Sequence, residues 1–378
     1  PVPPTCCPCL PDYPPQPSCV PLVETCVNMT SARGDGVGLG MLGDLLVFAG
    51  GAKGNANLST IDVYNTTDNT WRHAHMSVTR VLFDGAALGH IAIFGCGEGD
   101  GGDTADVLDA RTMKVTTVKL AGGSRKKCAA VSVTLAKDAT SGMPTAGKII
   151  IGGGYKSTAV DVYDYATGKW SLAPPMSISH FYMAAASAGP YSLFCGGLAP
   201  SGDTDICDIY DAIQNTWSIG HLAKPVREIG ASSTSTAAGG DLAIFLGGGQ
   251  TSVFNATEFA LDSTSTAVWT YANSSTQNPT SPWGKMGRAM VGENGEPGRY
   301  ALFGGGNGNN PNIQVFDGAT GAFTFARKNL SFGREQVMGA GGVNKVAFAG
   351  GSIGAYKPTG FTARVDIFDI TELLRIGG

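Results

Sequence analysis

One short motif occurs seven times along the 378 residues, and this repetition constrains the fold more than any other feature. Each copy is an aromatic residue or isoleucine, then one small or apolar residue, then a glycine pair or a close variant of it. The leading residues are Phe48, Phe94, Ile151, Phe194, Phe245, Phe303 and Phe348. Phe48 and Phe348 are 300 positions apart over six intervals, so the mean period is 50 residues. Such a period is typical of architectures in which similar units stack on one another.

The elements of each repeat follow in a fixed order. The motif closes a short apolar run, such as residues 45–48, which predicts a buried strand. In the next run polar and apolar residues alternate, as in residues 62–65, which predicts a half-buried strand that ends in a turn. In several repeats a further aromatic residue follows after seven positions, as Trp71 follows Tyr64, and it predicts a third element.

This order of glycine pair, Tyr-Asp and Trp resembles the kelch repeat, and the resemblance covers residues 22–370. Kelch repeats form β-propeller blades of four antiparallel strands around a central channel. The resemblance therefore implies an all-β fold, a seven-bladed kelch-type β-propeller over residues 22–378. The second and fifth repeats depart from the pattern, which leaves their loop lengths open.

The two ends of the repeat region complement each other. The seventh repeat stops without a tryptophan strand, and the chain before the first repeat supplies a strand with no repeat of its own. Met29 lies four residues before Arg33, and the same spacing separates Met76 from Arg80. We therefore expect residues 22–33 to provide the outer strand of blade seven and to close the ring, which leaves no open sheet edge there.

Residues 1–21 differ in composition, with nine prolines and four cysteines, and we expect them to form an extended arm of polyproline II type. The nine cysteines of the chain are Cys6, Cys7, Cys9, Cys19, Cys26, Cys96, Cys128, Cys195 and Cys207. The expected strand positions bring Cys96 near Cys128 and Cys195 near Cys207, which predicts two disulfides. The five remaining cysteines cannot all pair within the arm and first strand. We therefore expect the arm to contact another chain, the alternative being a disordered tail with a local Cys19–Cys26 bond.

Several features predict an extracellular glycoprotein. Asparagines stand in N-x-[ST] sequons at Asn28, Asn57, Asn65, Asn255, Asn273 and Asn329. The chain begins at Pro1, as expected after removal of a signal peptide or at an artificial boundary. Disulfides and sequons together favour an extracellular location over a cytosolic protein with free thiols. The net charge of −4 gives no electrostatic footprint for nucleic acid, and no apolar run is long enough to predict a membrane span.

A basic residue opens most of the expected blades. These residues are Arg33, Arg80, Arg125, His180, Arg227, Arg288 and Arg334. Inner strands would bring them to one mouth of the channel, where a ring of guanidinium groups can bind a carboxylate or a sulfate bidentately. The alternative is a structural role in which they pair locally with Asp35, Asp84, Glu228 or Glu335.

Two kinds of metal site are conceivable. Copper radical oxidases that resemble galactose oxidase carry kelch propellers, and their copper needs two histidines and two tyrosines. The five histidines, at positions 73, 75, 90, 180 and 221, show no such cluster. Calcium could use the acidic loops that contain Glu98, Asp100, Asp103, Asp106, Asp203, Asp205 and Asp208, although such loops are also ordinary solvated turns. We expect no cofactor, with calcium as the open alternative.

The sequence therefore predicts a non-enzymatic extracellular glycoprotein that acts as an interaction or assembly module, such as a surface, matrix or filament subunit that associates with itself. One rival is a carbohydrate- or protein-binding propeller that uses the arginine-ringed mouth of the channel. The other is an enzyme of the copper radical oxidase kind.

Overall fold

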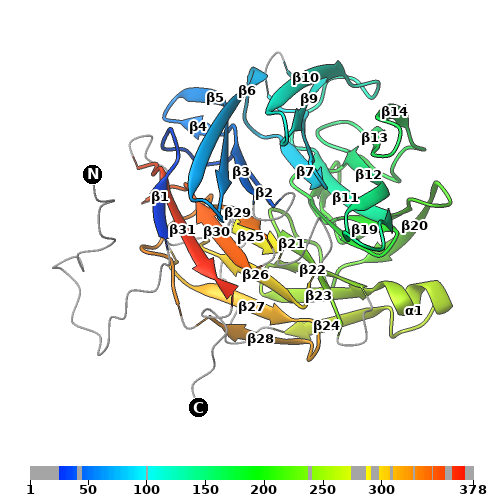
Figure 1. The fold of residues 1–378 in the computed structure, drawn as a ribbon. Helices are drawn as coiled ribbons and strands as arrows, with labels where there is room; N and C mark the ends of the chain where they lie inside the picture. Colours follow the sequence, from blue (N-terminus) through cyan, green and yellow to red (C-terminus); the bar gives the residue numbers. More distant parts are fainter. Residues whose placement is uncertain are drawn as a thin grey trace, which may run out of the picture.

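The computed structural model describes residues 25–40, 45–98, 101–236, 241–273, 287–290, 298–306, 310–326, 328–342, 344–353 and 360–370. Within these residues the chain forms seven antiparallel sheets arranged as the blades of a β-propeller (Figure 1). The predicted all-β, seven-bladed architecture is therefore confirmed. The arm at residues 1–21, with Cys6, Cys7, Cys9 and Cys19, lies outside the described residues.

Blades one to four follow the chain from their innermost to their outermost strand. Blade one contains β2 (Val37–Gly40), β3 (Leu45–Ala49), β5 (Ala56–Asn65) and β6 (Thr70–Arg80), with the short β4 (Ala52–Lys53) paired with β5. Blade two contains β7 (Asp84–Leu88), β8 (Ile91–Gly95), β9 (Thr104–Asp109) and β10 (Lys114–Lys119). Blade three contains β11 (Ala129–Lys137), β12 (Pro144–Gly152), β13 (Val160–Asp164) and β14 (Lys169–Leu172). Blade four contains β15 (Ala184–Ala188), β16 (Tyr191–Cys195), β19 (Ile206–Asp211) and β20 (Thr216–His221), and β17 (Leu198–Ala199) pairs with β18 (Gly202–Asp203) beside it.

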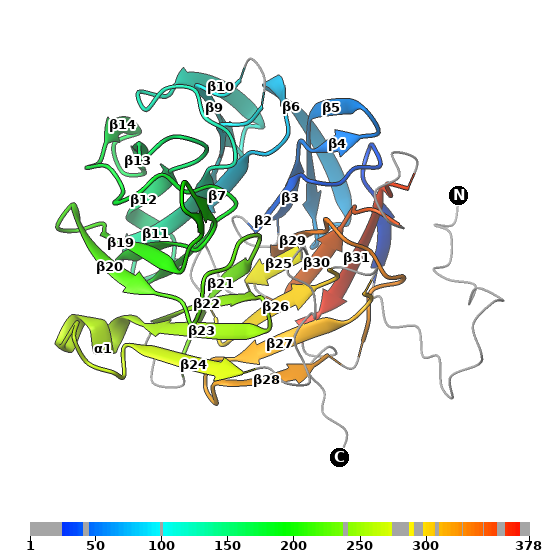
Figure 2. The same ribbon diagram turned by 180° about the vertical axis from the view of Figure 1, so that it is seen from behind.

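Blades five to seven complete the ring. Blade five contains β21 (Gly230–Ser235), β22 (Asp241–Gly247), β23 (Gln250–Asn255) and β24 (Trp269–Asn273), with the helix α1 (Ala256–Leu261) between β23 and β24. Blade six contains β25 (Gly287–Met290), β26 (Tyr300–Gly304), β27 (Ile313–Asp317) and β28 (Ala322–Phe325). Blade seven contains β29 (Met338–Gly341), β30 (Lys345–Ala349), β31 (Arg364–Asp369) and β1 (Thr25–Asn28). Viewed from behind, β2, β7, β11, β21, β25 and β29 again gather around the centre of the ring (Figure 2). No helix of the described part is long and apolar enough to cross a bilayer.

The N-terminal strand closes the ring, as the sequence predicts. β1 pairs antiparallel with β31 and thereby becomes the outer strand of blade seven, with Val27 opposite Val365. Met29 follows directly and is buried in the cluster that joins blades seven and one. The first described strand of the chain is therefore hydrogen-bonded to the last one, and blade seven has four strands like its neighbours.

The apolar second strands form the interior of each blade, because both faces of a blade are covered by its neighbours. All five residues of β3 and of β8 are buried, as predicted for these runs. The expectation of a half-buried third strand is wrong. In β13 and β31 the central residues are buried on both faces, including the polar Asp161 and Asp366. A neighbouring blade covers the face that the alternation assigns to solvent, and a buried cation neutralises each aspartate.

The third and fourth strands meet through the predicted aromatic pairs. Tyr64 lies opposite Trp71 with their rings 4.8 Å apart, and Tyr210 lies opposite Trp217 at 5.0 Å. Such tilted ring pairs add about 0.5–1.5 kcal/mol to the free energy gained from burial alone. They fix the register of the outer strand in each blade where they occur.

The glycine pairs connect neighbouring blades through the backbone. Gly51 at the end of blade one donates its N–H to the carbonyl of Arg80, which leads into blade two, and Gly351 donates to the carbonyl of Arg33 in the same way. Gly50 and Gly51 have φ values of 57° and 89°, in the left-handed region. A Cβ atom on Gly50 would also lie 2.6 Å from the ring of Phe83, so both conformation and space require glycine there.

Two disulfides connect the pairs predicted from the sequence. Cys96 is bonded to Cys128, which joins the end of β8 in blade two to the start of β11 in blade three, and Cys195 is bonded to Cys207 within blade four. The Cα atoms of each pair are 6.6 Å and 4.0 Å apart, within the limit of about 7 Å for a bridge. Cys26 belongs to β1.

Replacement of Cys96 and Cys128 together by serine is expected to lower the free energy of unfolding by about 3–4 kcal/mol. The bond closes a loop with a sequence separation of 32, and cross-linking such a loop restricts the unfolded chain by roughly this amount. Urea denaturation of the oxidised protein and of the double variant measures the difference. Equal midpoints for the two proteins would contradict the expectation.

Candidate functional site

Five of the seven basic residues singled out in the sequence are buried, each against an aspartate of the third strand of the blade that it enters. The pairs are Arg33–Asp62, Arg80–Asp106, Arg125–Asp161, His180–Asp208 and Arg334–Asp366, with closest nitrogen–oxygen distances between 2.5 and 3.5 Å. Burial of a charge is tolerated when the charge is paired and hydrogen-bonded, as it is in the four arginine pairs. These pairs therefore belong to the interior of the blades.

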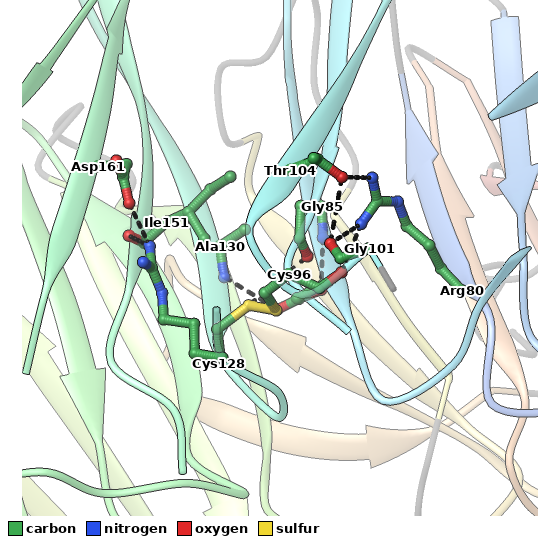
Figure 3. The surroundings of a disulfide bond; sticks show 12 residues. Arg80, Gly85, Cys96, Gly101, Thr104, Cys128, Ala130, Ile151 and Asp161 are labelled. Atoms are coloured by element: carbon green, nitrogen blue, oxygen red, sulfur yellow. Dashed lines mark hydrogen bonds and ion pairs between the residues drawn. A yellow bond between two sulfur atoms is a disulfide. The ribbon is translucent and has the colours of Figure 1, made fainter. Parts of the chain in front are cut away.

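Arg80 illustrates how completely such a cation is used. Its guanidinium donates to both the Asp106 carboxylate and the Thr104 hydroxyl, and also to the backbone carbonyls of Cys96 and Gly101. Figure 3 shows Arg80 directed at Thr104 and Gly101 beside the Cys96–Cys128 disulfide, with Asp161 on the opposite side of that bond. The arginine thus satisfies inward-facing carbonyls of the loop that joins the second strand to the third.

Arg33 shows the electrostatic balance of these pairs. Burial lowers the pKa of the Arg33 guanidinium, and the nearby Asp62 carboxylate acts in the opposite direction. An arginine pKa begins so high that the group stays charged at neutral pH. The side chain also donates to the carbonyls of Gly50 and Thr60, so the charge is fully engaged by the protein.

The predicted ring of ligand-binding cations at the mouth of the channel is therefore wrong for five of its members. Arg33, Arg80, Arg125, His180 and Arg334 have at most 3% of their surface exposed, so no ligand reaches them. The alternative of local pairing with Asp35, Asp84, Glu228 or Glu335 is also wrong for these five, although their role is structural. Their aspartate partners lie 26 to 36 residues further along the chain rather than beside them.

Blade five explains when such a cation is needed. The carbonyl that accepts the Gly197 N–H belongs to Val226, as the carbonyl that accepts the Gly51 N–H belongs to Arg80. Val226, and not Arg227, therefore stands at the position of the buried arginine. The aspartate position is also changed, because Ser252 stands opposite Phe245 where Asp62 stands opposite Phe48. The connection from β22 to β23 is a two-residue hairpin, so no long loop presents carbonyls to a cation. Arg227 instead pairs at the surface with Asp203, at 3.2 Å.

The sequence analysis missed a second ring of residues. Each lies two positions after the residue whose backbone carbonyl accepts the glycine N–H of the preceding blade, as Arg80 does for Gly51. The described members of this ring are Asp35, Leu82, Lys127, Tyr182, Glu228 and Gln336, and all six have φ between 54° and 60°. Positive φ is uncommon for bulky residues, so its recurrence reflects the shared geometry of the turn into each inner strand. These residues differ from blade to blade in charge and size. We call them the mouth residues.

The mouth residues lead into a cavity of about 340 Å³ between the inner strands. All of them except Glu228 line it, together with small residues of the inner strands. The amide of Gln336 donates to Asp35 at 3.0 Å, and the Nζ atom of Lys127 lies 3.9 Å from the centre of the Tyr182 ring. Volumes of this order are typical of small-molecule sites, so this cavity is the best candidate for a binding site in the described part of the chain.

Arg288 is the one predicted cation that lines this cavity. It belongs to β25 in blade six, and its Nη2 atom lies 3.3 Å from an oxygen of Asp84 in blade two. The sequence analysis considered Asp84 as a local partner of a basic residue; Asp84 instead pairs with Arg288, in a distant blade.

Three of the histidines contact a tyrosine or a carboxylate in the described part of the chain. His90 contacts the Tyr165 hydroxyl at 2.8 Å, and burial lowers the pKa of His90 and raises that of Tyr165. His73 and His221 contact Asp62 and Asp205. Among the described residues no three metal-ligating side chains of the histidine, cysteine, aspartate or glutamate type come together.

The acidic loops considered for calcium distribute their carboxylates among separate basic side chains. Asp106 and Asp208 are buried against Arg80 and His180. Asp103 and Glu98 pair with lysines, and Asp203 and Asp205 pair with Arg227 and His221. Asp100 lies outside the described residues. The described carboxylates of these loops thus each lie against a basic side chain.

The sequon asparagines whose side chains are described are all at least partly accessible. Asn28, Asn57 and Asn329 are exposed, and Asn65 and Asn255 are intermediate. Asn255 also accepts hydrogen bonds from the first amides of α1. Asn273 ends β24, and its side chain lies outside the described part.

No protein-family model matches the chain, and a search of curated proteins finds no significant match.

Proposed function

We propose that the chain is a non-catalytic extracellular subunit that assembles with copies of itself through the rim of its propeller. The observation that supports the proposal is a set of four exposed apolar residues on consecutive outer strands, β14, β20, β24 and β28, which follow one another along the rim (Figure 1). The residues are Leu172, Ile219, Tyr271 and Phe325, with 52%, 57%, 48% and 41% of their surface exposed. We call them the rim band.

The rim band occupies one register position in four blades. Leu172 lies opposite Asp161 in β13, and Ile219 lies opposite Asp208 in β19. In blades one and two the same position holds His73 and Thr117, which hydrogen-bond the aspartates opposite them. Among the described side chains at this position, the exposed apolar ones belong to blades three to six, and we take this shared position as the basis of a protein contact.

The proline-rich segment 1–21 of a second copy is the occupant that we propose for the rim band. Proline-rich chains dock on surfaces that present aromatic rings, and Tyr271 and Phe325 provide such rings. The segment precedes β1, which lies at the outer edge of blade seven, and 21 residues of polyproline II reach about 65 Å. A covalent bond between copies through a leftover cysteine of this segment would reinforce the contact.

Deletion of residues 1–20 is expected to convert particles of several chains into monomers, and replacement of both Leu172 and Ile219 by serine is expected to do the same. Each change removes one side of the contact and leaves the ring intact. Light scattering and electron microscopy under non-reducing conditions measure particle size. The control is Ile353→Ser, which removes an equally exposed isoleucine from outside the rim band. Particles of unchanged size in both variants would refute the assembly.

We further propose that the repeats are of the kelch type and that the protein is glycosylated in the secretory pathway. The order of glycine pair, Tyr-Asp and Trp supports the first proposal, and the accessible sequons with two disulfides support the second. Enzymatic deglycosylation of protein from a eukaryotic secretory host is expected to lower its mass by several glycans. An unchanged mass would contradict the glycosylation.

A further inference from the structure

Arg288 stands at a position where the other six blades carry only glycine or alanine. It lies opposite Phe303, and the residues opposite the corresponding aromatic or isoleucine are Gly38, Gly85, Ala130, Ala185, Ala231 and Gly339. Small residues there let the inner strands approach one another. The side chain of Arg288 is 35% exposed, so it extends into the central cavity that it lines.

The contact between Arg288 and Asp84 leaves most of the guanidinium available. Only its Nη2 atom contacts Asp84, at 3.3 and 3.4 Å, while Nε and Nη1 have no partner among the described residues. Asp84 is held independently, because its carboxylate accepts the backbone N–H groups of Gly85 and Ala130 at 2.9 and 3.0 Å. A planar guanidinium with free donors is suited to bidentate binding of a carboxylate.

The lining of the cavity carries two cations and two carboxylates, and its unused hydrogen-bond donors, rather than its net charge, favour a carboxylate ligand. Lys127, the second cation of the lining, contacts the Tyr182 ring and forms no ion pair within the described part of the chain. The two carboxylates of the lining already accept neutral donors, Asp84 from the backbone and Asp35 from the Gln336 amide. Both cations therefore keep hydrogen-bond donors that a ligand can use, whereas both carboxylates already accept hydrogen bonds from the protein.

Hydroxyl groups line the same cavity on blades three to five. Ser187 and Ser233 hydrogen-bond each other across two blades, with their oxygens 3.3 Å apart. Ser132 and Ser232 also line the cavity, and their hydroxyls make no hydrogen bond among the described residues. Free hydroxyls near a cation match a ligand that carries both hydroxyl groups and a negative charge.

We propose that the cavity binds one hydroxylated carboxylate of about the size of a single sugar unit, such as a uronic acid. The carboxylate lies on the free donors of Arg288, and the sugar hydroxyls bond to Ser132 and Ser232. Tyr182 at the mouth covers the apolar face of the sugar ring. The site is separate from the rim band, so it adds a ligand to the protein whether or not copies assemble.

Calorimetric titration with glucuronate tests the site, with glucose as the neutral control ligand. Glucuronate is expected to bind at least about tenfold more tightly than glucose, because a charge-assisted hydrogen bond is lost with the neutral sugar. Arg288→Ala is expected to weaken glucuronate binding by about tenfold or more, and six blades carry glycine or alanine at this position, so the fold accepts the change. Arg299→Ala removes an exposed arginine of the same blade and is expected to leave binding unchanged.

The other outcomes are equally decisive. If glucuronate does not bind, if glucose binds as well, or if Arg288→Ala binds glucuronate like the original protein, the proposal is overturned. A lower melting temperature of Arg288→Ala without any difference in binding assigns Arg288 a purely structural role and also overturns it. A uronate trimer that binds as tightly as the monomer identifies the end of a polysaccharide as the source, and a trimer that is excluded identifies the free acid.

Discussion

Replacement of Arg80 by alanine is expected to lower the free energy of unfolding by about 3–5 kcal/mol, because it leaves Asp106 as a buried charge without its partner. The carbonyls of Cys96 and Gly101 lose their donor in the same step. These groups have no access to water that would compensate, since Arg80 and Asp106 are fully buried. Urea or thermal denaturation of the variant measures the loss.

The matched control for this substitution is Arg227→Ala. Arg227 directly follows Val226, which stands in blade five where Arg80 stands in blade two. Its pair with Asp203 is exposed to solvent, with 29% and 36% of the two side chains accessible. Exposed pairs contribute about 0–1 kcal/mol, so this variant is expected to remain close to the original stability. Similar losses in the two variants would show that burial of the pair is not what matters.

Deletion of residues 1–28 is expected to cause unfolding or aggregation at temperatures where the full chain is stable. The deletion removes β1 and exposes the ladder groups of β31 as an open sheet edge in blade seven. It also leaves Met29 without a fixed position in the joint between blades seven and one, where loss of a buried methionine side chain alone costs about 2–5 kcal/mol. Size-exclusion chromatography and thermal unfolding of the truncated chain provide the measurement.

Deletion of residues 1–21 serves as its control, because it removes the proline-rich segment and retains β1. This shorter truncation is expected to keep the melting temperature of the full chain. A monomeric 1–28 deletion that melts at the same temperature as the 1–21 deletion would show that β1 does not stabilise the ring.

Much of the fold was predictable because most repeats carry the same local signals. The glycine pair, the Tyr-Trp spacing and the Met29–Arg33 spacing each recur along the chain. Each recurrence predicts the same pairing of strands in another blade. What alternation could not predict was burial of the third strand. Asp161 has the polar position of a solvent-facing residue, and only the neighbouring blade and Arg125 explain why it is buried.

The aspartate partners of the buried basic residues could have been predicted in part. In four of the five buried pairs an arginine contacts the aspartate of the third-strand motif that lies 26 to 36 residues after it. Blade five lacks both the arginine and the aspartate, with Val226 and Ser252 in their places, which supports the pairing. The rim band also has a sequence signal, since Leu172 and Ile219 each follow their aspartate by 11 positions. The mouth residues have none, because their chemistry differs in every blade while only the backbone conformation is shared.

The contact of Arg288 with Asp84 had no signal beyond the residue types. The two residues are 204 positions apart, and their proximity depends on the diameter of a ring of seven blades. A repeat pattern predicts what neighbouring blades do to one another. It does not predict which side chains meet across the centre.

Closure by β1 and β31 also sets the order of events during synthesis. Val27 and Val365 are paired although 338 positions separate them, so β1 leaves the ribosome long before its partner exists. At roughly 5–20 residues per second this interval lasts about 20–70 s. Throughout that time β1 is an unpaired strand, and the β31 of another nascent chain offers it the same register. Exchange of this strand between chains is therefore the misassembly to which this ring is most vulnerable, and chains made on one polysome are the most exposed to it.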